Sequence, residues 1–514
     1  MRHRCNELTR RTFLKLVSAS AAWIALTNAP GCKPAERATS SPQPERVLAN
    51  DSPPAPAQRA LTFRSRPDLN PPAVDVTRQA HDTVPGHIFV APKSRGVGQH
   101  GPMIVDDSGQ PVWFRPMQGD GPLAMNFKVQ HYQGEPVLTW WEGFYGSQGP
   151  DEYVILDSSY REITRLRAGN GHPEGDHHEF LITPQNTALI TIYNPVRGDL
   201  SPVGGPKDGL VWEGIVQELD IETGRVLFEW RSLDHVGLDE TSAKPSEGPH
   251  TGIDYFHINS IDVDHDDNLL VSARKTSTVY KIDREGGELI WRLGGKKSDF
   301  EMGPGTRFAY QHDARRQPDG TITIFDNGPT IFDNRHAKAV EESRGIVLEL
   351  DEEGMTAALV REYTHSHKLF ADTGGSMQVL PNGNVFVGWG SEPVFSEFTK
   401  HGGLLFSASL PPKDASYRAF RFPWSGHPSD QPVAVAERVS EEEVRVFASW
   451  NGATQVATWE VLAGPSPNQL KSSRSVPRNG FETAMLVRTA EQHIVVRAKH
   501  RSGRVLGTSA PVVL

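Results

Sequence analysis

A repeat of strand pairs runs through the middle of the chain and leaves few folds open to it. In each copy an apolar strand ends at an acidic residue, a turn follows, and a second strand begins, as in VYKIDREGGELIWRL. A strand pair with a Gly, Asn or Asp turn precedes it, as in INSIDVDHDDNLLVSAR. The segments around Asp107 and Thr399 resemble these copies. In the other four copies the acidic residues that end this strand mark the repeat, and they lie 63, 63 and 68 residues apart: Asp157, Asp220, Asp283 and Asp351.

A single four-stranded antiparallel unit cannot bury both of its faces, whereas units stacked around an axis bury them against one another. The sequence therefore predicts an all-β fold with a six-bladed β-propeller over residues 101–410. A pair of β-sandwiches is the alternative, and the regular strand pairs argue against it. Residues 60–100 predict an N-terminal β segment that leads into the propeller. Residues 420–514 leave the repeat and predict a small β-sandwich of the Ig or fibronectin III type.

The N-terminus has the pattern of an export signal. Arg10 and Arg11 precede Thr-Phe-Leu-Lys and an apolar stretch over residues 16–26. This stretch is shorter than the roughly 20 apolar residues that cross a bilayer, and a basic start with a short apolar core is typical of a leader. The paired arginines resemble the twin-arginine signal. We therefore predict such a signal peptide over residues 1–32 and a periplasmic or other extracytoplasmic location; an ordinary secretory leader is the alternative.

Both cysteines of the chain, Cys5 and Cys32, lie in this leader, so the folded part has none for a disulfide. Cys32 follows Ala29, Pro30 and a glycine, which resembles the lipobox of a lipoprotein, although Ala29 and Pro30 are unusual there. We predict lipidation at Cys32 and anchoring in the membrane; a cysteine left over from the leader is the alternative. Residues 33–59 are rich in Pro, Ser and Ala and predict a tether.

The charge of the chain bears on its partners. The formal net charge is −10, and the leader contributes +4 from five basic residues and one acidic residue, which leaves −14 for the remainder. A surface this acidic argues against nucleic acid as a partner. An anionic substrate would need a locally positive site.

The propeller prediction also says where distant residues should meet, because the start of each innermost strand and the end of the second strand lie on one rim of the channel. Three copies carry a histidine at the first place: His178 (beside His177), His257 (with Asn259) and His312. One such histidine would be an ordinary polar residue, but three at equivalent positions predict a functional cluster. At the end of the second strand, five copies carry an arginine, an amide or an aromatic residue: Trp141, Tyr193, Arg274, Asn327 and Trp389.

A histidine cluster with an arginine beside it suits one class of chemistry. Three histidines can bind a metal, but Arg274 on the same rim would repel a cation, so we predict neither a metal nor another cofactor. A neutral histidine is a competent nucleophile, and arginine and imidazole groups can hold charged oxygens. With aromatic walls, such a site suits an anionic oxyester of an aromatic group.

Three segments resemble the arylsulfotransferase family, in the branch found in many bacteria and fungi: FHINSID with VSARKTSTVYKID, then FAYQHDARRQPDGTITIFDNG, then GSMQVLPNGNVFVGWGSEPVFSEF. The resemblance covers about residues 60–510. It implies a six-bladed propeller with a central funnel. It also implies that a sulfuryl group moves from a small aromatic sulfate donor to a phenolic acceptor, by a ping-pong mechanism through a sulfated histidine and without a nucleotide sulfate donor. The best-studied branch differs in having a disulfide and an N-terminal Ig-like domain.

The resemblance also implies roles for particular residues. His312 in YQHDA matches the nucleophile, and His257 and Asn259 in FHINS match a catalytic His-x-Asn pair. His257, with Arg274 in VSAR, would hold the sulfuryl oxygens. The remaining catalytic histidine matches His178 in DHHEF, which would protonate the departing phenolate, or less closely His177. Residues expected to bind the aromatic substrate are His177, Tyr193, Trp141, Asn327 and Trp389.

Two other functions fit the same sequence: a lipid-anchored propeller that binds a ligand without catalysis, and a hydrolase in which water accepts the sulfuryl group. A calcium loop is a separate possibility at Asp262, Asp264 and Asp266, which alternate along the chain. The glycine and the final glutamate of such a loop are missing, so we interpret the three as an acidic hairpin turn.

Overall fold

The computed structural model describes residues 59–93, 97–117, 121–144, 151–246, 252–328 and 342–514. The predicted signal peptide, Cys32 and all of the predicted tether except Arg59 lie outside these ranges. The described part is all-β, as predicted, with one short α-helix, α1 (Ser232–His235), and two 3₁₀ turns, η1 (Ser201–Val203) and η2 (Leu238–Glu240). None of the described helices is long and apolar enough to cross a membrane.

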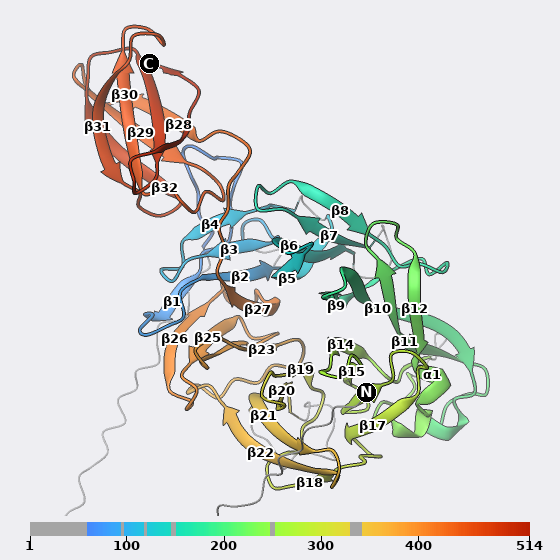
Figure 1. The fold of residues 1–514 in the computed structure, drawn as a ribbon. Coiled ribbons are helices and arrows are strands. Elements are labelled where there is room, and N and C mark those ends of the chain that lie inside the picture. Colours follow the sequence, from blue (N-terminus) through green and yellow to red (C-terminus); the bar gives the residue numbers. More distant parts are fainter. Residues whose placement is uncertain (1–58, 94–96, 118–120, 145–150, 247–251, 329–341) are drawn as a thin grey trace, which may run out of the picture. The chain divides into compact units, whose positions relative to one another are not determined.

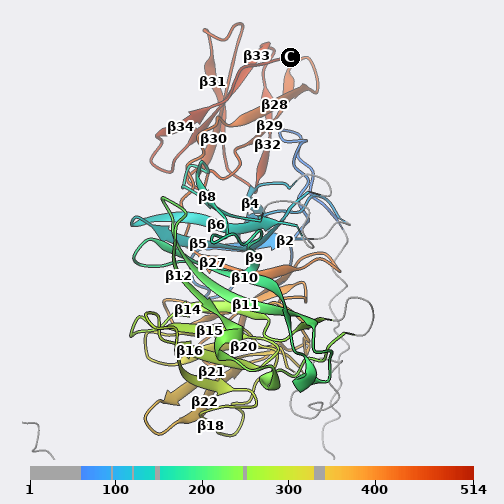
Figure 2. The same cartoon turned by 90° about the vertical axis from the view of Figure 1, so that its right-hand side faces the viewer.

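Six antiparallel sheets with four main strands each account for most of the described chain (Figures 1 and 2). The strand named first in each sheet contacts the neighbouring sheets and is called its inner strand. The first sheet is β27 (Ser416–Phe422), β2 (His87–Pro92), β3 (Met103–Val105) and β4 (Pro111–Phe114); the second is β5 (Leu123–Tyr132), β6 (Glu135–Gly143), β7 (Glu152–Leu156) and β8 (Glu162–Leu166). The third is β9 (Asp176–Ile182), β10 (Thr187–Gly198), β11 (Gly209–Asp220) and β12 (Val226–Arg231); the fourth is β14 (Ile258–Val263), β15 (Leu269–Ala273), β16 (Thr278–Ile282) and β17 (Leu289–Gly294). The fifth is β19 (His312–Arg316), β20 (Ile322–Asp326), β21 (Arg344–Asp351) and β22 (Thr356–Tyr363); the sixth is β23 (Ser376–Val379), β24 (Val385–Gly388), β25 (Val394–Phe398) and β26 (Leu404–Ser409). Short strands extend three of them: β1 (Asp75–Arg78) beside β26, β13 (Gly252–Asp254) beside β11 and β18 (Glu301–Met302) beside β22.

The six inner strands contact one another in cyclic order: β5 with β9, β9 with β14, β14 with β19, β19 with β23, β23 with β27, and β27 with β5. A buried apolar cluster lies between each pair of neighbouring sheets. Ile155 of β7 shares one with Ile190 of β10, and Phe89 of β2 shares another with Trp140 of β6. Because alternate side chains of a strand point to opposite faces, each sheet buries both faces against its two neighbours.

The aspartates and the threonine that mark the repeat stand at the turns of the outer strand pairs. Asp157 Oδ1, for example, accepts hydrogen bonds from the backbone N–H groups of Ser159 at 2.8 Å and Arg161 at 2.9 Å. Such bonds explain why Asp and Thr favour turns. In the first copy Asp106, and not Asp107, makes them. Equivalent bonds are made by Asp220, Asp283, Asp351 and Thr399.

The first sheet joins two distant parts of the chain. β27 pairs with β2 in antiparallel register, with Phe420 opposite Phe89. The predicted propeller range, 101–410, leaves out both strands, because β2 precedes it and β27 follows it. Residues 60–100, predicted to lead into the propeller, also provide β1, which pairs with β26 of the sixth sheet. The strands of each of these two pairs, β2 with β27 and β1 with β26, are far apart in the chain and no turn joins them. The repeat pattern consists of strands joined by turns, so it cannot reveal such pairs.

The strands after β27 form two further antiparallel sheets. One is β28 (Val433–Arg438), β29 (Glu443–Ser449) and β32 (Glu482–Arg488). The other is β30 (Thr458–Gly464), β31 (Lys471–Pro477), β33 (His493–Lys499), β34 (Val505–Thr508) and β35 (Val512–Val513). Val446 of β29 and Trp459 of β30 belong to one buried cluster, so the two sheets share a core as the strands of a β-sandwich do. The Ig or fibronectin III type stays a prediction.

Candidate active site

The histidines predicted to converge lie together at the starts of three inner strands. His178 is in β9, His257 directly precedes β14, and His312 is the first residue of β19. The ring centroids of His178 and His257 are 5.0 Å apart. Tyr417 of β27 links the third histidine to them, since its ring is 5.5 Å from His178 and 6.1 Å from His312. We call His177, His178, His257 and His312 the histidine cluster.

Irregular backbone at the starts of the inner strands aims these side chains. The pairing of β14 with β15 shifts between Ile258 and Ser260, and that of β19 with β20 shifts between His312 and Arg315. His257, next to the first shift, has a φ of +56°, which places it in the left-handed region. Such bulges redirect side chains that would otherwise alternate between the two faces of the sheet, and they are common next to active sites.

The hydrogen bonds of His312 fix which ring nitrogen carries the proton. Nδ1 lies 2.7 Å from Oδ1 of Asn327, while Asn327 Nδ2 donates to the backbone oxygens of Ala371 at 2.8 Å and Gly374 at 3.0 Å. Oδ1 is therefore the acceptor and Nδ1 the donor. In the neutral ring the lone pair is then on Nε2, which accepts a hydrogen bond of 3.3 Å from the backbone N–H of Gly374.

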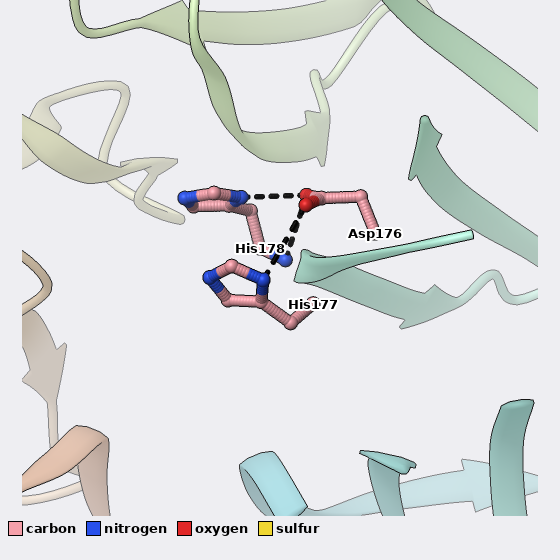
Figure 3. Close-up of side chains that lie close together, drawn as sticks. All are labelled: Asp176, His177 and His178. Atoms are coloured by element: carbon pink, nitrogen blue, oxygen red, sulfur yellow. Dashed lines mark hydrogen bonds and ion pairs between the residues drawn. The ribbon is translucent and has the colours of Figure 1, made fainter. Parts of the chain in front are cut away.

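Carboxylates, and not amides, hold the other histidines. Asp176 Oδ2 lies 2.6 Å from Nδ1 of His178, and Asp254 Oδ2 makes a short hydrogen bond with Nδ1 of His257. His177 Nδ1 is 3.4 Å from Asp176 Oδ1. Figure 3 shows both rings reaching the same carboxylate with their Nε2 atoms pointing away from it. Each histidine of the cluster therefore has its Nδ1 atom against a side-chain oxygen, and its Nε2 atom on the opposite side of the ring.

Burial decides the protonation states. It lowers the pKa of His178 and His312 well below the ordinary value, so both are neutral at pH 7. It raises the pKa of Asp176. Burial would also raise the pKa of Asp254, but the charge and hydrogen bond of His257 outweigh it and hold that pKa below its usual range. A neutral His178 with its proton on Nδ1 has no proton on Nε2 to give, which is contrary to the expected role as a proton donor.

Arg274 supplies a positive charge beside the cluster. Its Nη2 donates to the backbone oxygen of Asp372 at 2.8 Å, and its guanidinium lies 4.9 Å from the ring centroid of Tyr310. Its Nε is buried and has no hydrogen-bond partner among the described residues. After burial, the charge of Arg274 is the next cause that lowers the pKa of His312. Lys275, which the sequence analysis missed, lies 5.7 Å from the same Tyr310 ring.

Residues 128–410 match the sequence model of the arylsulfotransferase (ASST) family, and they include the histidine cluster and Arg274. The chain belongs to the arylsulfotransferase family. This membership supports sulfotransferase activity, with an aryl sulfate as donor and a phenol as acceptor, as the general class. No curated protein matches the chain in sequence.

Solved structures resemble this chain only loosely. A protein of unknown function from Bacteroides caccae is 15% identical, with a TM-score of 0.38, over 66% of this chain and 99% of its own. Virginiamycin B lyase from Staphylococcus aureus with quinupristin is 8% identical, with a TM-score of 0.34, over 74% of this chain and 97% of its own. These likenesses are too slight to bear on function.

The other predicted site residues divide into two groups. Trp141 and Tyr193 lie at the cluster, with ring centroids 5.4 Å from His177 and from His178 respectively. Asn327 holds His312, and is not free to bind substrate. Asn259 is fully buried, and its Nδ2 donates to the backbone oxygen of Gln311 at 2.6 Å, so it joins β14 to the segment before β19.

Trp389 was also predicted to bind the substrate, and its side chain lies between two sheets rather than at the histidine cluster. Its side chain is fully buried in the apolar cluster between the fifth and sixth sheets, with its ring centroid 5.9 Å from that of Phe325. Its indole N–H donates to Ser396 Oγ at 3.3 Å. The position at a strand end is as expected, but the side chain points into the sheet interface.

One metal-ligand set exists among the described residues: atoms of Asp176, His177 and His178 lie within 4.8 Å of one another. Asp176 Oδ2 already accepts hydrogen bonds from the backbone N–H and Nδ1 of His178 and from Thr191 Oγ1. A metal ion bound through Oδ2 would have to replace these bonds. The arrangement of these three residues also has an explanation without a metal ion, because the carboxylate of Asp176 orients both imidazole rings.

A buried ionic network lies next to the cluster along the inner strands. Glu179 Oε1 accepts from Lys128 Nζ at 2.9 Å, and its Oε2 accepts from Arg418 at 3.0 Å and, through a short bond, from Arg315. Asp313 accepts from the backbone N–H of β23, and Arg418 donates to the backbone oxygen of β14. The network therefore joins all six inner strands: β5, β9, β14, β19, β23 and β27.

A cavity of about 580 Å³ lies at the other ends of these strands, beyond the network. Residues of the cluster do not line it; side chains around it include Gln130, Ile182, Asp262, Gln378 and Phe420. Nearby, Asp264 and Asp266 lie in the turn between β14 and β15, as the acidic-hairpin interpretation expected. Lys281 pairs with both, at 3.0 and 2.8 Å.

Proposed function

We propose that this arylsulfotransferase moves a sulfuryl group from an aromatic sulfate ester to a phenolic acceptor in two steps, through a sulfohistidine at His312 and without a nucleotide sulfate donor. The observation that carries the proposal is the hydrogen bond from His312 Nδ1 to Asn327, because it leaves the nucleophilic lone pair on Nε2. An amide partner fixes this tautomer without placing a negative charge beside the ring.

In the first step the long hydrogen bond from the Gly374 N–H to Nε2 of His312 breaks and Nε2 attacks sulfur. The N–S bond forms, and the S–O bond to the aromatic ring breaks with its electron pair on the phenol oxygen. Arg274 is the cation that holds the sulfuryl oxygens, and its unpaired Nε–H is a spare donor for one of them. The sulfuryl group stays on His312 while the first aromatic group leaves as a phenolate, so one aromatic wall serves donor and acceptor in turn.

In the second step the acceptor phenol attacks sulfur and must lose a proton. His178 is the base for this step, because it is neutral, with Nδ1 bonded to a carboxylate and Nε2 turned away from it. The carboxylate of Asp176 stabilises the imidazolium that forms. His257 helps Arg274 to hold the sulfuryl oxygens. A carboxylate-backed histidine thus moves the proton, and the amide-backed histidine carries the sulfuryl group.

We also propose that the six sheets are the blades of a closed six-bladed propeller. The cyclic contacts of the inner strands support this, and so does the pairing of β27 with β2, which would close the ring with strands from both ends of the repeat. The rim at the start of the inner strands would then hold the histidine cluster, and the other rim the cavity.

A chromogenic aryl sulfate, supplied with and without a phenol, tests the proposed function. We expect a limited release of phenol without acceptor and continuous release with it, because the sulfuryl group must leave His312 before a second turnover. Continuous release without acceptor would indicate a hydrolase. Absence of release with all aryl sulfates would favour a binding protein.

Arg274→Lys should lower turnover by about 10²-fold or more, because lysine lacks the planar fork of donors and cannot keep the bond to Asp372 while holding two sulfuryl oxygens. Steady-state kinetics with the chromogenic donor would measure the loss. Arg197→Lys, at a side chain that is 69% exposed, is the matched control. Full turnover in the Arg274 variant would show that this guanidinium does not contact the transferred group.

We propose that the protein is exported and anchored by a lipid on Cys32, as its N-terminal sequence predicts. Cys32→Ser should then move the protein from the membrane fraction to the soluble extracytoplasmic fraction, as detected by immunoblotting. Cys5→Ser, which changes the other cysteine of the leader, should leave it in the membrane fraction. Equal membrane retention of the two variants would reject lipidation at Cys32.

A further inference from the structure

Tyr417 lies against three histidines of the cluster, although neither the repeat nor the rim prediction includes it. It belongs to β27, the inner strand of the first sheet. Its ring centroid is 5.5 Å from those of His177 and His178 and 6.1 Å from that of His312, each with edge-to-face geometry. Its side chain therefore contacts both the nucleophile and a base of the proposed reaction.

The hydroxyl of Tyr417 has no hydrogen-bond partner among the described residues, although the residue is only 5% exposed. A buried polar group left unpaired costs about 1–3 kcal/mol, so such groups are rare and often serve a ligand. Tyr417 itself is well held: its backbone oxygen accepts a hydrogen bond from Gly375 at 2.9 Å, and the guanidinium of Arg418 lies 5.2 Å from its ring centroid. The ring is fixed while its hydroxyl remains available.

The hydrogen-bond donors on three neighbouring rings are already committed. His178 and His312 direct their Nδ1 protons to Asp176 and Asn327, and the hydroxyl of Tyr193 donates to the backbone oxygen of Ile258 at 3.1 Å. Burial raises the pKa of Tyr417, so its hydroxyl keeps its proton across the physiological range. A neutral donor that cannot ionise suits an oxygen on which negative charge develops.

We propose that Tyr417 is a further catalytic residue, whose hydroxyl donates a hydrogen bond to the bridging oxygen between sulfur and the aromatic ring. This rests on the proposed function. As the S–O bond breaks, the electron pair moves onto that oxygen and the hydrogen bond strengthens. The proton stays on Tyr417. In the second step the same hydroxyl holds the oxygen of the acceptor phenol while His178 removes its proton.

Tyr417→Phe tests the proposal with a series of aryl sulfates. The hydrogen bond matters most where the leaving phenolate is least stable, so we expect a loss of about 10²-fold in kcat/KM for phenyl sulfate and of about 10-fold or less for 4-nitrophenyl sulfate. The thermal midpoint of the variant should equal or exceed that of the wild type, because an unpaired buried hydroxyl is removed. The control is Tyr363→Phe, at the end of β22, which loses a hydroxyl that donates to the backbone oxygen of Lys400. Its kinetics should be unchanged.

Equal losses for all leaving groups, or wild-type kinetics, would overturn the role of Tyr417 and leave the proposed function intact. A marked fall in the thermal midpoint would also overturn it, since the hydroxyl would then be paired within the folded protein. If the wild type releases no phenol from any aryl sulfate, the proposed function fails and the role of Tyr417 fails with it.

Discussion

Replacing His312 with alanine should reduce phenol release from an aryl sulfate by at least about 10⁴-fold in kcat, the scale seen when a covalent nucleophile is removed. The physical reason is that His312 has its lone pair on Nε2 and an uncharged amide, Asn327, behind the ring, whereas carboxylates hold His178 and His257 and favour the protonated ring there. A continuous absorbance assay with a chromogenic donor would measure the loss.

The intermediate can be observed directly. Wild-type protein incubated with an aryl sulfate and no acceptor should gain one sulfuryl group, which intact-protein mass spectrometry detects and which a phenol removes. Peptide mapping should place it on the peptide that contains His312. His265→Ala, at an exposed histidine in the turn between β14 and β15, is the matched control and should form the adduct normally. An adduct on His178 or His257 would show that the nucleophile is misassigned.

Glu179→Ala should lower the free energy of unfolding by about 3–5 kcal/mol, because the buried cations of Arg315 and Arg418 lose the carboxylate of Glu179 and then share that of Asp313. Burial already lowers the pKa of Lys128 to about 8, so that lysine can release its proton when its partner is lost. The arginines cannot do so. Thermal or denaturant unfolding followed by circular dichroism would measure the change.

Glu285→Ala, at an exposed glutamate in the turn between β16 and β17, is the control for Glu179→Ala and should leave stability within about 0.5 kcal/mol. Arg315, Arg418 and Lys128 hold the pKa of Glu179 well below its usual range, against the effect of burial. The stabilisation is therefore present above the unfolded pKa of about 4.3 and is lost as the pH falls through the lower folded value. Unchanged stability of Glu179→Ala would mean that water, and not the carboxylate, solvates these cations.

Local sequence signals predicted much of the candidate site because equivalent positions of a repeat occupy equivalent places in space. His178, His257 and His312 could be placed together in this way. The oxygen partners of two of them were also within reach, since Asp176 is two residues before His178 and Asp254 is three before His257. A search for an acidic residue just before each histidine would have found both.

The prediction failed where the direction of a side chain mattered. Trp389 and Arg274 both follow a second strand, yet Arg274 lies at the histidine cluster and Trp389 lies between two sheets. Side chains of a strand alternate with a period of two, so a shift of one residue exchanges the two faces. Bulges introduce such shifts at the starts of β14 and β19. The repeat pattern of the sequence does not show where a bulge occurs.

By itself the sequence determined the turns, the number of repeat copies and the apolar strands, because each depends on residues close together in the chain. Asp157 or Asp351 bonds to backbone two or three residues away, and that information is local. Only the tertiary structure decided that β27 pairs with β2, that Tyr417 joins the histidines, and that Glu179 is neutralised by three cations from other strands. These contacts join segments far apart in the chain, and no short-range pattern carries a record of which distant partner a buried group will meet.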